Sequence, residues 1–178
     1  MTRNYPAQRY FMSEWKLFAV DLARRAGALL KDKLNQKHDV QYKGDINLVT
    51  EADKMSEDLI IAAIRRRFPD HGILSEESPA ITSAGKLRWI IDPLDGTTNY
   101  AHGFPFFCVS IALEDAGEVI LGVIYDPLRE DVFVAERGKG AYLNEKKMAV
   151  STVKELSRSL LATGFPYHNY DRMKPYME

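Results

Sequence analysis

Residues 106–137, FFCVSIALEDAGEVILGVIYDPLREDVFVAER, decide the fold class. Apolar residues alternate with small or polar ones along 106–113, which indicates a strand with one buried face. The residues expected on that face are Phe107, Val109, Ile111 and Leu113. The turn residues Asp115-Ala116-Gly117 follow, so 118–125 is expected to return as a second strand.

Further strands are predicted on both sides of this segment. Asp126-Pro127 indicates another turn before a strand at 131–137. Upstream, 87–91 is expected to form a strand that Pro93 stops, because proline cannot donate to a ladder. The later strands are expected at 141–143 and 158–163. Consecutive strands joined by short turns indicate an antiparallel meander.

Two helices are predicted before the strands. Residues 13–34 carry apolar side chains at three- and four-residue spacings, which gives this helix one apolar face. The second helix, 51–68, begins after Thr50, a possible cap, with Asp53 in the capping-box position. Helices followed by a run of strands favour an α+β fold, with N-terminal helices packed on a mainly antiparallel sheet.

The expected domain organisation has three parts. Residues 1–12 are expected to form a loose leader, 13–166 an α+β domain and 167–178 an irregular tail. Two helices can cover one face of the sheet, and the sequence supplies little for the opposite face.

Composition and charge exclude several classes of protein. The chain has 24 basic and 25 acidic residues, a formal net charge of −1, which argues against a nucleic-acid partner. The single cysteine, Cys108, excludes an internal disulfide framework and fits a reducing, cytoplasmic location. No apolar run approaches the ~18–20 residues of a transmembrane helix, so no membrane partner is expected.

The segment with the clearest chemistry is 89–99, WIIDPLDGTTN. An apolar strand leads directly into Asp92 and Asp95, and a bend between them can bring both carboxylates to one side. The carbonyl of Leu94 can then point between them. Gly96 lets a ligand approach closely, and the hydroxyls that follow suit the start of a helix, where phosphate binds.

Neighbouring carboxylates in a neutral protein repel each other unless a cation lies between them. All the donors offered here are oxygen atoms, which favours Mg²⁺, Mn²⁺ or Ca²⁺ over zinc. Mg²⁺ typically uses one or two carboxylates, waters and substrate phosphate oxygens, and a glutamate of residues 75–78 (SEES) can complete such a site. The alternative is structural, because Asp-Pro and Asp-Gly are ordinary turn residues and Asp53 can serve only as part of a capping box.

Three blocks in this order resemble the inositol monophosphatase family of Mg²⁺-dependent, lithium-sensitive sugar-phosphate phosphatases. They are residues 48–53 (LVTEAD), 75–78 (SEES) and 89–100 (WIIDPLDGTTNY). Residues 138–141 and 161–166 also resemble this family. The resemblance covers about residues 14–168 and implies the first half of a layered α/β phosphatase fold.

The same resemblance implies a role for each matching residue. The metal ligands would be Glu76, Asp92, Asp95 and the carbonyl of Leu94. The substrate-binding residues would be Gly96, Thr97 and Leu94. The catalytic residues would be Asp53, Thr97 and Glu76, with the Asp53–Thr97 pair orienting the attacking water. The implied reaction is in-line attack of a metal-activated water on a small polyol or sugar phosphomonoester, inositol 1-phosphate first among them.

One family motif has no counterpart in this sequence. Relatives carry Trp-Asp-x-Ala-Ala-Gly downstream, whereas Trp15 and Trp89 are followed here by Lys16 and Ile90. We therefore expect that the C-terminal α/β half is absent and that these 178 residues alone turn over little or no substrate. A homodimer is expected of the complete protein.

Other functions stay open at this point. Fructose 1,6-bisphosphate, histidinol phosphate and nucleotide 3′-phosphates are alternative substrates within the family. A non-enzymatic, transcription-associated binding protein is the alternative of a different class, with Arg65-Arg66-Arg67 as the candidate contact.

Overall fold

Helices precede the main sheet, as expected. The computed structural model describes residues 8–34, 40–43, 47–83 and 85–162, with side-chain environments for 14–34, 51–83 and 85–162. The helices are α1 (Gln8–Lys33), α2 (Glu51–Arg67), the short α3 (Thr97–Ala101) and a 3₁₀ turn, η1 (Leu156–Arg158). Strands β1 (Val40–Lys43) and β2 (Asn47–Thr50) form a small antiparallel hairpin.

A seven-stranded sheet forms the centre of the described chain, with its strands in chain order. They are β3 (Gly72–Ser75), β4 (Leu87–Asp95), β5 (Cys108–Asp115), β6 (Glu118–Asp126), β7 (Asp131–Glu136), β8 (Gly140–Leu143) and β9 (Lys146–Lys147). β3 pairs with β4 in parallel and every later pair is antiparallel. The predicted α+β class and antiparallel meander are confirmed.

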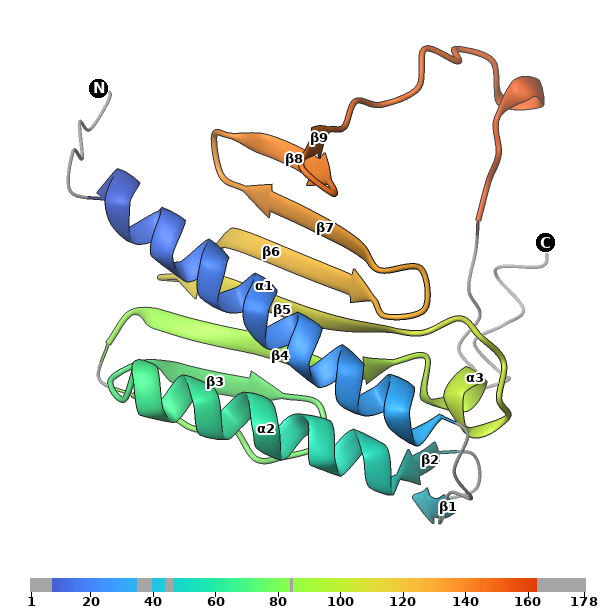
Figure 1. Ribbon diagram of the computed structural model, residues 1–178. Helices are drawn as coiled ribbons and strands as arrows, with labels where there is room; N and C mark the ends of the chain where they lie inside the picture. The colour runs from blue at the N-terminus through green and yellow to red at the C-terminus, as the bar shows by residue number, and fades with distance from the viewer. Residues whose placement is uncertain (1–7, 35–39, 44–46, 84, 163–178) are drawn as a thin grey trace, which may run out of the picture.

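Helices α1 and α2 lie side by side on one face of the sheet (Figure 1). The predicted apolar face of β5 is buried there, in one hydrophobic cluster with Leu22 and Leu30 of α1. On the opposite face a row of small residues crosses four strands in register: Ala112, Gly122, Ala135 and Ala141. Ile124 on that face is 44% exposed, so within the described chain helices cover one face only.

Helix α1 begins earlier than predicted from the sequence. It starts at Gln8 instead of near residue 13, so residues 8–12 do not belong to a loose leader. Gln8, Arg9 and Met12 favour helix, and residues 8–13 contain neither proline nor glycine to interrupt it. Residues 1–7 and the tail expected at 167–178 lie outside the described residues.

Strand β4 does not stop at Pro93, which corrects the predicted end at residue 91. It runs to Asp95 because the ladder with β5 contains an irregularity. Asp92 pairs with Ser110 and Asp95 with Cys108, so β4 carries one residue more than its partner over this interval. A bulge of this kind tolerates proline, since the residue left over makes no ladder bond.

The strand expected at 158–163 is not formed in the described residues. The last sheet strand is β9, after which the chain leaves the sheet (Figure 1). Residues 159–162 are irregular, and Leu160 is 99% exposed. Without a neighbouring strand to pair with, an apolar run cannot satisfy its backbone groups as a strand. No helix in the described part of the chain is long and apolar enough to cross a bilayer.

Candidate active site

Strands β3 and β4 bring two acidic residues together at their ends. Their last pair in register is Ser75 with Ile91, and the parallel direction puts Glu76 next to Asp92 just beyond it. Ser75 and Ile91 are buried toward the helices, so the alternation of side chains directs Glu76 and Asp92 to the other side. The Glu76 carboxylate lies close enough to Asp92 to raise the pKa of that residue.

Hydrogen bonds fix the bend that follows Asp92. The backbone N–H of Leu94 donates to Oδ1 of Asp92 at 3.1 Å. The hydroxyl of Thr97 donates to the carbonyl oxygen of Leu94 at 3.0 Å. The bend therefore holds Asp92, the Leu94 carbonyl and Thr97 in one connected unit. That the Leu94 carbonyl points between Asp92 and Asp95 stays a prediction.

Gly96 joins this bend to α3, and any side chain at this position would be strained. Its φ is 95°, in the left-handed region, and a Cβ added there would lie 3.0 Å from the Phe106 carbonyl oxygen. The same carbonyl accepts a 2.9 Å hydrogen bond from the Asn99 side-chain amide. The β4–α3 connection is thus packed against the start of the next strand, and α3 begins at Thr97 as predicted.

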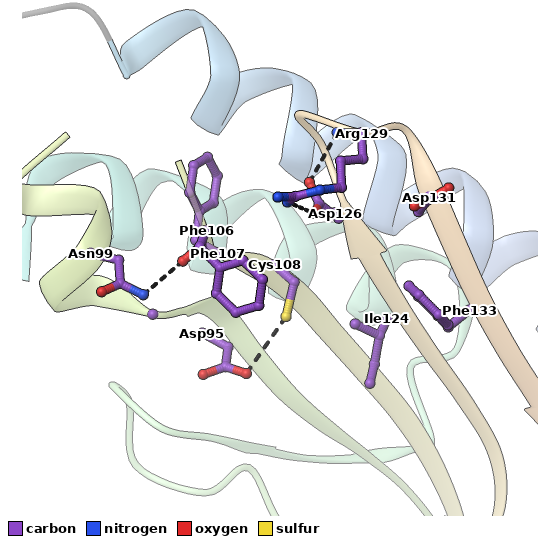
Figure 2. Close-up of a pocket in the computed structure, with 11 residues that line it drawn as sticks. Asp95, Asn99, Phe106, Phe107, Cys108, Ile124, Asp126, Arg129, Asp131 and Phe133 are labelled. Carbon is purple, nitrogen blue, oxygen red and sulfur yellow. Dashed lines mark hydrogen bonds and ion pairs between the residues drawn. The ribbon is translucent and has the colours of Figure 1, made fainter. Parts of the chain in front are cut away.

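The acidic residues influence one another strongly. Burial, and after it the charges of Glu76 and Asp95, raise the pKa of Asp92 to about 7. Asp95 itself is exposed and turned toward β5, where its Oδ2 lies 3.6 Å from the Cys108 Sγ (Figure 2). Within the described residues no three acidic, histidine or cysteine side chains converge into a finished metal cage. Glu76, Asp92 and Asp95 share one end of the sheet without closing on one point.

The donors present nevertheless fit a hard divalent cation. They are carboxylate and carbonyl oxygens, and mutual repulsion among three carboxylates is what a cation relieves. The Cys108 thiol is a poor competitor for such a role. Burial first, and then the Asp95 charge, raise the pKa of that thiol to about 12, so it stays protonated.

Helix α2 supplies three buried polar residues below the site. They are Asp53, Ser56 and Glu57, each 3% exposed or less. Ser56 donates to the Pro93 carbonyl oxygen at 2.9 Å, and Glu57 accepts hydrogen bonds from two serines of the 75–78 turn. Of these three residues, only Asp53 was predicted from the sequence. The i, i+3, i+4 spacing of three polar residues on a half-buried helix was the available signal for the other two.

Asp53 and Thr97 were expected to form a pair that orients water. Asp53 is buried on the face of α2 that carries Ser56, and Thr97 lies at the start of α3. The Thr97 hydroxyl donates to Leu94, a contact that leaves its oxygen lone pairs available. The pairing of Asp53 with Thr97 stays a prediction.

A pocket of about 400 Å³ opens beside the bend, next to Asp95 and Gly96 (Figure 2). Its other side is built by Phe106, Asp126 and Arg129. The Arg129 guanidinium donates to Asp126 at 2.7 Å and lies 5.5 Å from the centre of the Phe106 ring. This volume accommodates a small molecule, and its arginine is already neutralised by an aspartate.

Comparisons with known proteins agree with the geometry. The model of the Inositol monophosphatase family matches residues 12–177. Inositol monophosphatase 1 from Solanum lycopersicum is 44% identical over 156 residues, which are 85% of this chain and 57% of that protein. The protein named Nus factor SuhB from Pasteurella multocida is 42% identical over 152 residues, 84% of this chain and 57% of that protein.

Solved structures share the fold. The inositol monophosphatase from Anabaena (Nostoc) has a TM-score of 0.77 and 43% identity, and the match covers 92% of this chain and 58% of that chain. The chain thus spans less than two thirds of the length of these relatives.

Proposed function

Because the chain belongs to the inositol monophosphatase family, we propose that Glu76 and the 92–97 bend bind Mg²⁺ for hydrolysis of a small sugar or polyol phosphomonoester. Inositol 1-phosphate is the first substrate to test. The observation that carries the proposal is the β3–β4 register, which sets Glu76 beside Asp92 immediately before a bend that exposes Asp95.

The residues of the proposed site have three tasks: binding the metal, orienting water and binding phosphate. Glu76, Asp92, Asp95 and the carbonyl of Leu94 are the proposed ligands. When bound, Mg²⁺ would lower the pKa of a water molecule and offset the charge of the phosphate. Thr97 and the buried Asp53 would orient the attacking water through hydrogen bonds. The backbone after Gly96 would donate to phosphate oxygens, which can come close because no Cβ intervenes.

The pocket beside Gly96 supports a small substrate. Its volume of about 400 Å³ suits a sugar or polyol ring, and Asp95 of the bend lines it. The alternatives named from the sequence, fructose 1,6-bisphosphate, histidinol phosphate and nucleotide 3′-phosphates, are tested by a substrate panel.

Metal binding is the most direct test of the site. We expect Mn²⁺, followed by electron paramagnetic resonance of the free ion, to bind the chain and to be displaced by Mg²⁺. Asp95→Asn should weaken this binding at least about tenfold, because it removes a charged ligand. Asp21→Asn, which removes an exposed carboxylate of α1, is the matched control. Unchanged binding by Asp95→Asn would refute the ligand assignment.

Turnover is tested separately, by phosphate release from inositol 1-phosphate in Mg²⁺. We expect little from these 178 residues alone, and steady Mg²⁺-dependent release would contradict that expectation. A chimera that continues this chain with the C-terminal portion of the Anabaena relative should release phosphate and lose the activity on Asp95→Asn. A folded chimera that binds Mn²⁺ but hydrolyses nothing in the panel would overturn the enzymatic proposal. Sedimentation of the chimera tests the expected homodimer.

A second candidate function rests on the relatives named Nus factor SuhB. In that case the chain would bind the transcription machinery, with Arg65 and Arg66 exposed at the end of α2 as the contact. This function would be favoured if the wild-type chain and Asp95→Asn captured RNA polymerase equally. The Arg65→Glu/Arg66→Glu variant should then lose the capture. No capture by either protein would exclude it.

A further inference from the structure

The turn that carries Glu76 is held from below by a buried carboxylate. Glu57 of α2 is 3% exposed, and its two oxygens accept hydrogen bonds from the hydroxyls at the two ends of the turn. Ser75 donates to Oε1, and Ser78 donates to Oε2 at 2.6 Å. One carboxylate therefore closes the four-residue turn on helix α2.

An ordinary ion pair does not explain the position of Glu57. No basic side chain among the residues with described environments lies within 4 Å of its carboxylate; the two serine hydroxyls are its partners there. Burying a carboxylate is unfavourable unless it is well hydrogen-bonded. A hydrophobic side chain at this position of α2 would pack in the core but would leave the turn without an anchor.

The direction of the turn follows from this anchor. Ser75 is buried and points toward α2, so Glu76 points away from α2 and toward Asp92. Ser56, one residue before Glu57, holds the Pro93 carbonyl of the neighbouring bend. Two adjacent residues of one helix thus set the spacing of the two segments that carry the proposed metal ligands.

We propose that Glu57 is a positioning residue, whose hydrogen bonds to Ser75 and Ser78 hold Glu76 in place to bind the metal beside Asp92. This inference rests on the proposed function. Glu57 does not contact the metal, and it acts through Glu76 alone. Substituting a residue that supports a metal ligand through hydrogen bonds commonly weakens metal binding by about tenfold to a hundredfold.

The test compares two neutralising substitutions at adjacent positions of α2. Glu57→Gln removes one acceptor and the charge, and Asp58→Asn removes an exposed carboxylate one residue later. Both are measured as the full 178-residue chain by Mn²⁺ binding at a temperature where circular dichroism shows them folded. We expect at least about tenfold weaker binding for Glu57→Gln and less than about twofold for Asp58→Asn. Wild-type affinity in Glu57→Gln overturns the proposal.

A double-mutant cycle distinguishes positioning from general loosening. In the Glu76→Gln background, Glu57→Gln should weaken Mn²⁺ binding no further, because the ligand through which it acts is gone. An equal additional loss would contradict action through Glu76. If Glu57→Gln does not fold, Ser75→Ala/Ser78→Ala removes the two donors instead and is judged by the same outcomes. Unchanged Mn²⁺ binding in Glu76→Gln itself would refute the proposed function, a result distinct from failure of the Glu57 proposal alone.

Discussion

The hydroxyl of Ser56 in α2 donates a 2.9 Å hydrogen bond to the carbonyl oxygen of Pro93 in the bulge of β4. Both residues are buried, so no water replaces this bond. The bulge leaves that carbonyl outside the regular ladder with β5, and the helix supplies its partner.

Ser56→Ala is expected to destabilise the chain by about 1–3 kcal/mol, because it leaves the buried Pro93 carbonyl without its donor. The free energy of unfolding in urea measures this cost. Ser157→Ala, at an exposed residue of η1, is the matched control and should change stability little. A loss no larger than the control's would mean that the bulge does not depend on this bond.

Asp92→Asn is expected to stabilise the metal-free chain at neutral pH. The pKa of Asp92 is about 7 in the folded chain and ordinarily 3.8, so ionisation costs the folded state stability as pH rises through this range. The stability gain of the variant, measured by urea unfolding in EDTA, should therefore be larger at pH 8 than at pH 5. The same variant should lose the increase in melting temperature that Mn²⁺ gives the wild type. A gain equal at both pH values would contradict the assignment.

His71 is expected to make stability fall in mild acid. Its Nδ1 accepts a 3.1 Å hydrogen bond from Trp89, and burial lowers its pKa below the ordinary 6.5, partly opposed by Asp70. The unfolded chain then binds the proton more readily, so stability is full above about pH 6.5 and declines as pH falls below it. His71→Gln should flatten the difference between pH 7.5 and 5.5, and His102→Gln, at an exposed residue, should not. Identical pH profiles for His71→Gln and the wild type would refute this.

Tyr100 is expected to stabilise the end of α1. Its hydroxyl donates a 2.7 Å hydrogen bond to the Leu30 carbonyl, one of the last four of that helix, which have no partner within it. Burial raises the pKa of Tyr100 to about 12, so the donor proton is retained. Tyr100→Phe should cost about 1–2 kcal/mol in thermal or urea unfolding. Tyr142→Phe removes a more exposed hydroxyl and should cost less.

The sheet could be predicted from the sequence because its strands follow one another along the chain. Alternation along residues 106–113 identified the buried face of β5, and short turns between strands left few ways to pair them. The predicted end of β4, at residue 91, was wrong for a physical reason. Proline excludes a regular ladder position, but whether a bulge absorbs it depends on the partner strand, here Ser110 and Cys108 of β5.

The candidate site could be predicted from the sequence only in part. The oxygen donors near residues 92–97 stand together in the sequence, so local pattern was enough to select them. The contributions of Ser56 and Glu57 were missed, since each lies 18 residues or more from its partners and no local pattern pairs them. The bend was expected to bring Asp95 to the same side as Asp92, and their binding of one cation stays a prediction. The contact of Asp95 Oδ2 with the Cys108 Sγ, at 3.6 Å, was not predicted from the sequence.

Residue type and local spacing therefore decided which groups carry the chemistry and which segments form helices and strands, because both depend on neighbours within a few positions. Tertiary packing alone decided how those groups meet. The parallel register of β3 with β4 sets Glu76 beside Asp92, and helix α2 anchors the two segments that bear them. Such contacts join residues distant in the chain, and their geometry exists only once helix and sheet share a core.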